Sequence, residues 1–399
     1  MLRAVTKWQP LIYGGEMKKE LELYIHIPFC IQKCAYCDFL SGPATEETIS
    51  KYVEALQKEI LSQEIFAKEY VVTTIFFGGG TPSILSGTQM KEIFKLLREV
   101  FVVDENAEIS MEANPGTVSK ENLIAYRQAG VNRISFGLQS VNNEELKTLG
   151  RIHTYEEFLE SFQLARECGF TNINVDLISA IPKQTLESWE QSVKSILELE
   201  PEHISAYGLI IEEGTPFFEM YGEGEVGEKL LPSEEEERMM YHRTEELLEK
   251  TGYHRYEISN YAKPEKECRH NLGYWERKEY LGMGLGASSL IQNQRFKNCD
   301  DLAFYIEHSH DSSKIREIEG VLSNQEQMEE YIFLGLRKID GISSRDFEET
   351  FGITLEECYG KGIRKMKTER LLEEENDMLR LTKIGIDISN YVFAEILYQ

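Results

Sequence analysis

Between residue 21 and about residue 290, short runs of β-branched and aromatic residues alternate with longer amphipathic runs. The short runs predict strands at residues 21–27, 73–77, 108–112, 133–136, 172–177 and 203–209. The longer runs predict helices at residues 46–68, 86–100, 119–128, 154–168 and 185–199. Repeated βα units are typical of a parallel sheet. Six units predict an α/β fold with an incomplete, TIM-like (β/α)6 barrel.

The rest of the chain has a different pattern. A helix is predicted at residues 234–251 and a strand at 256–259, before a glycine-rich segment at 281–290. Short helical segments follow at 323–338, 343–351 and 355–369, then residues 378–381 and a helix-like 385–397. We therefore predict three parts: an N-terminal extension (1–20), the barrel with an extension (21–300), and a small winged-helix-like, mostly helical domain (310–399). With 399 residues and 41% hydrophobic content, each of the two larger parts can bury a core.

Three cysteines, Cys30, Cys34 and Cys37, follow the first predicted strand in a C-x3-C-x2-C spacing. A 4Fe-4S cluster normally has one thiolate on each iron, so three cysteines leave one iron open for a substrate or cofactor. Zinc also binds thiolates, but a structural zinc site takes four protein ligands, and no partner C-x2-C pair is present. The remaining cysteines are scattered singly, at Cys168, Cys268, Cys299 and Cys358. This arrangement favours a cluster in a reducing compartment over a disulfide framework.

Polar or glycine residues stand where several predicted strands end. The second strand ends in three glycines at residues 78–80, which let the main chain approach a ligand but serve equally well in a tight turn. Glu112, Gln139 and Asp176 hold similar positions on later strands, and each could instead cap a helix. Arg151 could pair with a carboxylate. Because parallel βα folds bind ligands at the carboxyl ends of their strands, we expect a site there.

The net charge of -26 and the pI of about 4.8 disfavour binding to nucleic acid. The glutamates at residues 234–237 suit the first turn of a helix with Ser233 as N-cap better than a metal site. The first residues lack the apolar core of a secretory signal, and no run of about 18 apolar residues is present. The sequence therefore predicts a cytoplasmic protein with at most peripheral membrane association.

A series of motifs resembles, in order, the heme chaperone branch of the oxygen-independent coproporphyrinogen III oxidase family, which belongs to the radical S-adenosylmethionine (SAM) superfamily. The motifs are YIHIPFC (24–30), GGGTPS (78–83), MEANPGT (111–117), GVNRIS (130–135), GLQS (137–140), LGRIH (149–153) and HNLGYW (270–275). In that superfamily, SAM chelates the open iron of the cluster, and one-electron reduction can split it to a radical. The resemblance thus implies a radical SAM barrel and three cofactors: a 4Fe-4S cluster, SAM and heme.

The resemblance also implies roles for individual residues. The SAM-contacting positions are Tyr24, Gly79, Gly80, Thr81, Glu112, Gln139, Arg151 and Asp176, with Tyr36 beside the cluster. The HNLGYW motif implies heme contacts for His270, Tyr274 and Trp275, since imidazole is an ordinary axial ligand of heme iron. Without the resemblance, Tyr24 would be a half-buried strand aromatic, His270 a capping residue and Trp275 a core residue. No catalytic residue is assigned, and Cys268 is a weaker ligand candidate.

Two functions from different classes remain open. The oxidases of the family carry a further cysteine two residues after the third, where this chain has Phe39. This difference favours a chaperone that binds heme and passes it to acceptor proteins such as respiratory cytochromes. The alternative is a radical enzyme of porphyrin biosynthesis that decarboxylates coproporphyrinogen III, since every expected SAM contact is present. Whether the chain is an enzyme stays open, as does the choice between monomer and homodimer.

Two further positions depart from the family pattern. Ser288 stands where relatives commonly have a histidine, so no role of that histidine carries over to this chain. The run ISAIP (178–182) lacks a usual glycine before its apolar-proline pair, a milder change. Neither position belongs to the three cluster cysteines.

Overall fold

In the part of the chain that the structure describes, six consecutive parallel strands form the centre of one sheet. In sheet order they are β2 (Glu16–Ile27), β3 (Tyr70–Gly79), β4 (Val102–Ala113), β5 (Arg133–Gln139), β6 (Ile173–Ser179) and β7 (His203–Gly208). The computed structural model describes residues 11–13 and 16–397. Residues 1–10 and 14–15 of the predicted extension lie outside the described residues, and its last five residues belong to β2. The prediction of an open, six-stranded parallel α/β sheet is confirmed.

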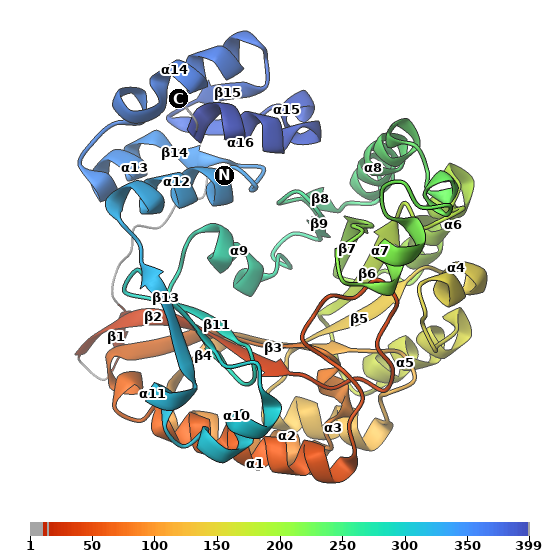
Figure 1. The fold of residues 1–399 in the computed structure, drawn as a ribbon, viewed down its shortest axis with the longest axis vertical. Coiled ribbons are helices and arrows are strands. Elements are labelled where there is room, and N and C mark those ends of the chain that lie inside the picture. Colours follow the sequence, from red (N-terminus) through yellow and green to blue (C-terminus); the bar gives the residue numbers. More distant parts are fainter. Residues whose placement is uncertain (1–10, 14–15, 398–399) are drawn as a thin grey trace.

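Helices follow these strands in the expected order and cover the outer face of the sheet (Figure 1). They are α1 (Glu46–Ser62), α2 (Gly87–Val100), α3 (Lys120–Ala129), α4 (Asn143–Thr148), α5 (Tyr155–Glu167) and α6 (Leu186–Leu197). Capping boxes, in which side chain and backbone bond reciprocally across the first turn, begin α2 at Ser86, α5 at Thr154 and α6 at Thr185. Fully buried strand residues such as Leu23 and Ile25 pack against helix residues such as Leu56 in one large core. Short 3-10 turns lie at Phe66–Glu69, Pro82–Ile84 and Glu228–Leu230.

The sheet extends beyond the six parallel strands at both edges. Beside β2 lie β10 (Tyr280–Met283), which is parallel to it, and then the antiparallel β11 (Ser288–Ile291), β12 (Gln294–Asn298) and β13 (Arg316–Val321). Beside β7 lie β9 (Asn260–Ala262) and β8 (His254–Arg255), and β1 (Leu11–Tyr13) pairs with β2. The helices of this region are α7 (Pro216–Tyr221), α8 (Glu234–Glu249), α10 (Leu302–His308) and α11 (Ser312–Ile315). Ser233 caps α8, as predicted.

The prediction of a strand at residues 256–259 is wrong, because these residues connect β8 to β9. The carboxylate of Glu257 accepts a hydrogen bond from the backbone N–H of Ser259 at 2.9 Å. A local side-chain bond of this kind stabilises a turn in competition with a strand.

Helix α9 (Arg269–Trp275) lies on the inner face of the sheet, against β3. The carboxylate of Glu108 accepts hydrogen bonds from the backbone N–H groups of Arg269 at 2.9 Å and His270 at 3.3 Å. A buried side chain of β4 thus caps the first turn of α9, where backbone N–H groups lack helical partners. Since α9 carries the HNLGYW motif, this cap fixes the motif inside the half-barrel.

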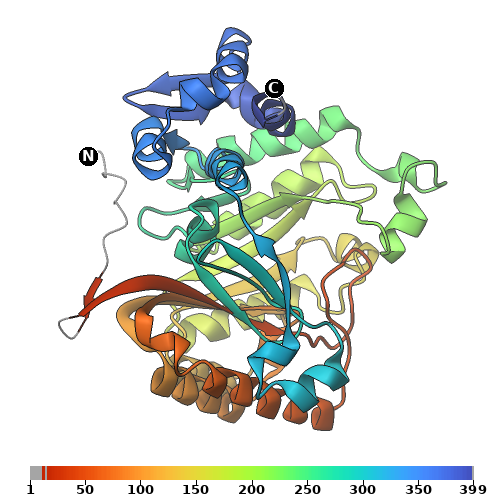
Figure 2. The same ribbon diagram turned by 60° about the vertical axis from the view of Figure 1, so that its left-hand side comes forward.

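The C-terminal part has its own core and sheet and packs beside α9 (Figure 2). Its helices are α12 (Asn324–Gly335), α13 (Ser344–Phe351), α14 (Leu355–Thr368), α15 (Lys383–Asp387) and α16 (Ser389–Leu397). Its three strands, β14 (Ile342–Ser343), β16 (Met378–Leu381) and β15 (Leu372–Glu375), pair in that order. The predicted helical C-terminal region is confirmed. Among the described residues, no helix has the length and apolar character that crossing a membrane requires.

Candidate functional site

Alternate residues of the parallel strands point into the half-barrel and form a polar interior. The register aligns Tyr24 with Phe76 on β2 and β3, and Glu112 with Ser135 on β4 and β5. On β6, Asp176 accepts a hydrogen bond from Ser135 Oγ at 2.9 Å and another from Asn174 Nδ2 at 2.8 Å. Inward side chains of a small barrel are usually branched and apolar. The polar layer here therefore indicates a ligand site.

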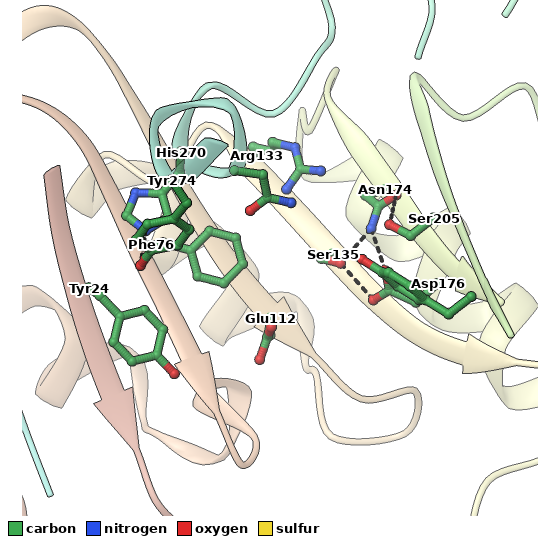
Figure 3. Close-up of a pocket in the computed structure, with 12 residues that line it drawn as sticks. Tyr24, Phe76, Glu112, Arg133, Ser135, Asn174, Asp176, Ser205, His270 and Tyr274 are labelled. Atoms are coloured by element: carbon green, nitrogen blue, oxygen red, sulfur yellow. Dashed lines mark hydrogen bonds between the residues drawn. The ribbon is translucent and has the colours of Figure 1, made fainter. Parts of the chain in front are cut away.

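A cavity of about 190 Å³ lies in this interior, beneath α9 (Figure 3). It is lined by Tyr24, Phe76, Glu112, Arg133, Ser135, Asn174, Asp176, Ser205, Tyr207, His270, Asn271 and Tyr274. Three predicted SAM positions, Tyr24, Glu112 and Asp176, thus share one cavity with two predicted heme positions, His270 and Tyr274. The sequence analysis missed the other seven residues, although polar residues at alternate positions of buried strands were a usable signal.

Burial makes the acidic end of this cavity sensitive to pH. Desolvation, with the nearby charge of Asp176, raises the pKa of Glu112 to about 8, although the backbone N–H of Gly79 donates to its Oε2 at 3.2 Å. The Tyr24 hydroxyl lies 3.0 Å from His26 Nδ1. The other ring nitrogen of His26, Nε2, lies 3.0 Å from the carbonyl oxygen of Leu40. Because that carbonyl only accepts, Nε2 of His26 carries the proton and Nδ1 accepts from Tyr24. The Tyr24 hydroxyl is thereby held at one side of the cavity.

The cysteine loop follows β2 and is fastened to distant parts of the chain. The backbone N–H of Cys30 donates to Gly42 O at 3.1 Å, and the N–H of Ala35 donates to Leu149 O at 3.1 Å. Ala35 O in turn accepts from the N–H of Phe217 at 3.0 Å. Tyr36 packs edge-on against the ring of Phe217. These contacts hold the loop at the carboxyl ends of the strands.

Burial raises the pKa of the Cys30 and Cys37 thiols, so these thiolates need a positive partner such as iron. Across residues 11–13 and 16–397, no three His, Cys, Asp or Glu side chains converge closely enough to hold a single metal ion. A 4Fe-4S cluster distributes its thiolates over separate irons, so its cysteines stand farther apart than the ligands of one ion. The three predicted cluster ligands, Cys30, Cys34 and Cys37, lie together on this one fastened loop.

Arg151 joins the cysteine loop to the strand ends. Its Nη1 lies 3.4 Å from Cys34 Sγ, and its Nη2 donates to Asn114 Oδ1 at 2.7 Å and to Gly137 O at 2.5 Å. Its Nε, although buried, has no partner among the described residues. A second, smaller pocket runs between the loop and Arg151 and also includes Asn114 and His153. A guanidinium group beside a cluster loop suits the carboxylate of an amino acid ligand.

The glycine motif at the end of β3 lies close to the cysteine loop. The N–H of Gly80 donates to Ile27 O at 2.8 Å, and that of Thr81 donates to Phe29 O at 2.7 Å. Gly79 has a φ of 107°, and a Cβ there would overlap the ring of His26. A Cβ at Gly80 would lie 2.5 Å from Phe29 O. Both positions thus require glycine, and they keep the main chain within reach of a ligand at the loop.

His270 belongs to α9 and is buried, with a polar partner at each ring nitrogen. Nδ1 lies 2.6 Å from Thr74 Oγ1, and Nε2 lies 2.9 Å from the hydroxyl of Tyr274. The ring stacks on Phe76 with centroids 5.2 Å apart. Desolvation lowers the pKa of His270 to about 3, so the imidazole is neutral at physiological pH. The neutral form is the one that binds metal ions, but Nε2 can bind iron only if the Tyr274 hydroxyl moves away.

Besides the cysteines, the glycine motif and Arg151, three predicted cofactor residues lie outside the cavity lining: Tyr36, Gln139 and Trp275. Trp275 turns toward the C-terminal part, where the guanidinium of Arg337 lies 5.3 Å from its ring centroid. Gln139 ends β5 with a positive φ of 76°, an uncommon conformation for a residue other than glycine. Tyr36 lies with the cysteine loop, as described above. Phe39, two residues beyond Cys37, is 62% exposed.

Comparisons with known proteins agree with this architecture. Residues 24–196 match the family model of the radical SAM superfamily, and residues 322–388 match that of the HemN C-terminal domain. The heme chaperone HemW of Lactococcus lactis is 37% identical over 96% of this chain and 98% of its own length. HemW of Bacillus subtilis is 36% identical over 94% of this chain and 98% of its own length. HemW of Escherichia coli is 42% identical over 68% of this chain and 70% of its own length.

The structure of coproporphyrinogen III oxidase (HemN) from Escherichia coli, a radical SAM enzyme, superposes with a TM-score of 0.82. The superposition covers 96% of this chain and 91% of that one, at 24% sequence identity. At this level of identity, the likeness establishes the fold.

Proposed function

The chain belongs to the family of the heme chaperone HemW, within the radical SAM superfamily, and from this premise we propose that it binds heme and transfers it to acceptor proteins. The observation that carries the proposal is the match to HemW proteins over nearly the full length of both chains. Phe39, which replaces the additional cysteine expected of an oxidase, supports the same choice.

At the carboxyl ends of the strands, Cys30, Cys34 and Cys37 would hold a 4Fe-4S cluster. SAM would lie between this loop and the cavity, in contact with Gly79, Gly80, Thr81, Glu112, Gln139, Arg151, Asp176, Tyr24 and, beside the cluster, Tyr36. When bound, the reduced cluster and SAM together supply one-electron chemistry. Arg151 would orient the SAM carboxylate, while the buried acids Glu112 and Asp176 would face its positively charged groups.

Heme would approach the opposite end of the cavity, at α9. His270 would be the protein ligand of the heme iron, since it is neutral and lies in the cavity lining. Tyr274 would move its hydroxyl off Nε2 and keep its ring beside the macrocycle. Trp275 would contact heme only at the outer side of α9, where its ring faces Arg337.

The finer assignments belong to the same proposal. We place the protein in the cytoplasm, as a monomer or homodimer with at most peripheral membrane contact, and take respiratory cytochromes as its acceptors. Two separate hydrophobic cores support a division into an N-terminal extension (1–20), a barrel with its extension (21–300) and a C-terminal domain (310–399). The strong negative charge disfavours nucleic acid as a partner.

A hemin titration of the cluster-reconstituted protein tests the proposal. We expect His270→Ala to weaken hemin binding at least about tenfold, the equivalent of about 1.4 kcal/mol, and to remove the spectrum of histidine-ligated iron. Tyr274→Phe should keep the binding, because it removes only the hydroxyl that occupies Nε2. His308→Ala is the matched control, since His308, partly exposed on α10, lies outside the cavity lining.

The same preparation should be assayed anaerobically for decarboxylation of coproporphyrinogen III. Robust turnover without hemin binding would overturn the chaperone proposal in favour of the oxidase alternative. Hemin binding that is equal in His270→Ala and His308→Ala would instead leave the chaperone function and reject His270 as the ligand.

A further inference from the structure

We propose that Arg133 forms a carboxylate-binding subsite for a propionate side chain of heme. This inference rests on the proposed heme-binding function, and it adds an anchor that is separate from the iron ligand. Arg133 begins β5 and reaches into the cavity between α9, which carries His270, and Asn174 of β6 (Figure 3).

The guanidinium of Arg133 is buried without a matching acceptor. The residue is only 2% exposed. Within the described residues, it donates one long hydrogen bond, from Nη1 to Ser110 Oγ at 3.5 Å, and its buried Nε has no acceptor. Arginine has five N–H donors, and leaving donors of a buried charge unpaired is costly. A ligand that carries a planar anion would satisfy them.

The carboxylates nearest to Arg133 are already occupied by other donors. Glu108 accepts from Cys268 Sγ at 3.4 Å and from the first N–H groups of α9. Asp176 accepts from Ser135 and Asn174. Neither carboxylate forms an ion pair with Arg133 among the described residues, although both contribute to the field that raises the pKa of its guanidinium. The acceptor that Arg133 lacks must therefore come from outside the chain.

The cavity has the size and lining for the side chain of a ligand. Its volume of about 190 Å³ is below the roughly 300–1,000 Å³ of sites that enclose a whole drug-sized molecule. A propionate arm fits this volume as it stands, whereas a tetrapyrrole ring bound at His270 requires the cavity to open, with the Tyr274 hydroxyl displaced from Nε2. Asn271, Ser205 and Ser135 offer further polar groups around Arg133. Glu112, with a pKa raised to about 8, is mostly uncharged near pH 7 and repels an incoming anion weakly.

The carboxylate of SAM is the other possible source of the anion. Arg151 is better placed for it, because its guanidinium lies 3.4 Å from Cys34 Sγ in the cluster loop, and it lines a separate pocket. Arg133 is absent from that pocket and lines the main cavity, where the predicted SAM positions Tyr24, Glu112 and Asp176 meet the predicted heme positions His270 and Tyr274. In this proposal, Arg151 binds the carboxylate of SAM and Arg133 binds a propionate of heme, at opposite ends of the site.

The test compares hemin with hemin dimethyl ester, in which both propionates are esterified. With the cluster-reconstituted wild type, we expect hemin to bind about 10- to 100-fold more tightly than the ester, because a hydrogen bond to a charged group is lost. Arg133→Gln should weaken hemin binding by the same factor and leave binding of the ester unchanged. Arg133→Lys should fall between, since lysine keeps the charge without the planar fork.

Measuring SAM affinity in the same variants distinguishes a SAM carboxylate from a heme propionate as the anion that Arg133 binds. Arg151→Gln should weaken SAM binding and keep the preference for hemin over its ester. If Arg133→Gln loses SAM affinity but keeps that preference, Arg133 serves SAM and the proposal is wrong. If the wild type binds hemin and its ester equally, the proposal is also wrong, even if Arg133→Gln does not fold. Failure of the wild type to bind hemin at all would reject the proposed function itself.

Discussion

Glu112 lies in the cavity with a pKa raised to about 8, so this carboxyl group is largely protonated at neutral pH in the protein without ligands. The unfolded chain has the ordinary value of 4.5. Since the folded state holds the proton more tightly, this group favours folding fully below about pH 4.5. Its contribution decreases as the pH rises and is lost above about pH 8.

Glu112→Gln should therefore remove a pH-dependent destabilisation. The amide remains neutral and can still accept from the N–H of Gly79. In the ligand-free protein, we expect the free energy of unfolding of Glu112→Gln to exceed that of the wild type by about 1–3 kcal/mol at pH 8.5, with partial solvent contact limiting the effect. The difference should nearly vanish at pH 5. Urea unfolding at both pH values measures it.

Glu64→Gln is the control, because Glu64 has an exposed side chain. A difference between wild type and Glu112→Gln that is equal at pH 5 and pH 8.5 would show that the raised pKa does not govern stability here.

At the residue scale, the sequence predicted part of the cavity but not Arg133. The strand-end rule selects the last residues of a strand, such as Glu112 and Asp176. Arg133 stands at the start of β5, and only the alternation of Arg133, Ser135 and Gly137 along that strand indicates its inward side. That α9 covers this layer from inside could not be predicted, since the contact joins residues more than 130 positions apart in the chain.

At the scale of elements, α9 depends on a close contact with β2. Glu22 is fully buried, and neither of its carboxylate oxygens has a hydrogen-bond partner among the described residues. A Cβ at Gly273 would overlap this carboxylate. The absence of a side chain at Gly273 therefore sets how closely α9 approaches the sheet. Glu22 lies beside His270, with Oε2 3.9 Å from Nδ1.

Gly273→Ala should lift α9 from the sheet. We expect it to lower the free energy of unfolding by about 1–3 kcal/mol, the usual cost of overpacking. In a Glu22→Ala background the same change should cost clearly less, because the overlapping carboxylate is gone. A double-mutant cycle by urea unfolding measures the coupling. Gly42→Ala is the control, since a Cβ there would meet nothing within 4 Å.

If Gly273→Ala costs the same with and without the Glu22 carboxylate, the two residues are not coupled and the contact does not position α9.

The parallel strands were predictable because each is a buried apolar run that precedes an amphipathic helix. The edge strands β10 to β13 were not, since they are short, rich in polar residues and glycine, and exist by pairing with neighbours. Helix α9 was missed for a related reason. It has only seven residues, and a cap from Glu108, distant in sequence, supports its first turn.

At the scale of the whole molecule, Glu330 of α12 fastens the C-terminal part to the barrel. Its carboxylate pairs with Arg277, which follows α9, at 2.8 Å and with Arg295 of β12 at 2.7 Å. Lys338 adds an ion pair to Glu276 at 3.2 Å. The C-terminal part is thus attached beside the helix that carries His270.

Glu330→Gln should loosen this attachment, because it leaves two arginines without their shared carboxylate. We expect the free energy of unfolding to fall by about 1–3 kcal/mol. This is less than the cost of breaking a fully buried ion pair, because Arg295 is partly exposed. Thermolysin, which cleaves before leucine, should also cut faster at Leu322 between β13 and α12. Glu329→Gln, one position away on the same helix, is the control. Identical proteolysis of the two variants would mean that Glu330 does not hold the two parts together.

The backbone hydrogen bonds that hold the cysteine loop also set an order of events during synthesis of the chain. The loop itself needs Leu149 and Phe217 for its backbone contacts, and β2 needs β10, near residue 280, as its parallel neighbour. A ribosome that has released only the first 200 residues has therefore exposed all three cysteines but not the structure that holds them. Iron-sulfur loading must follow the synthesis of most of the chain, and until then the thiols depend on the reducing power of their surroundings.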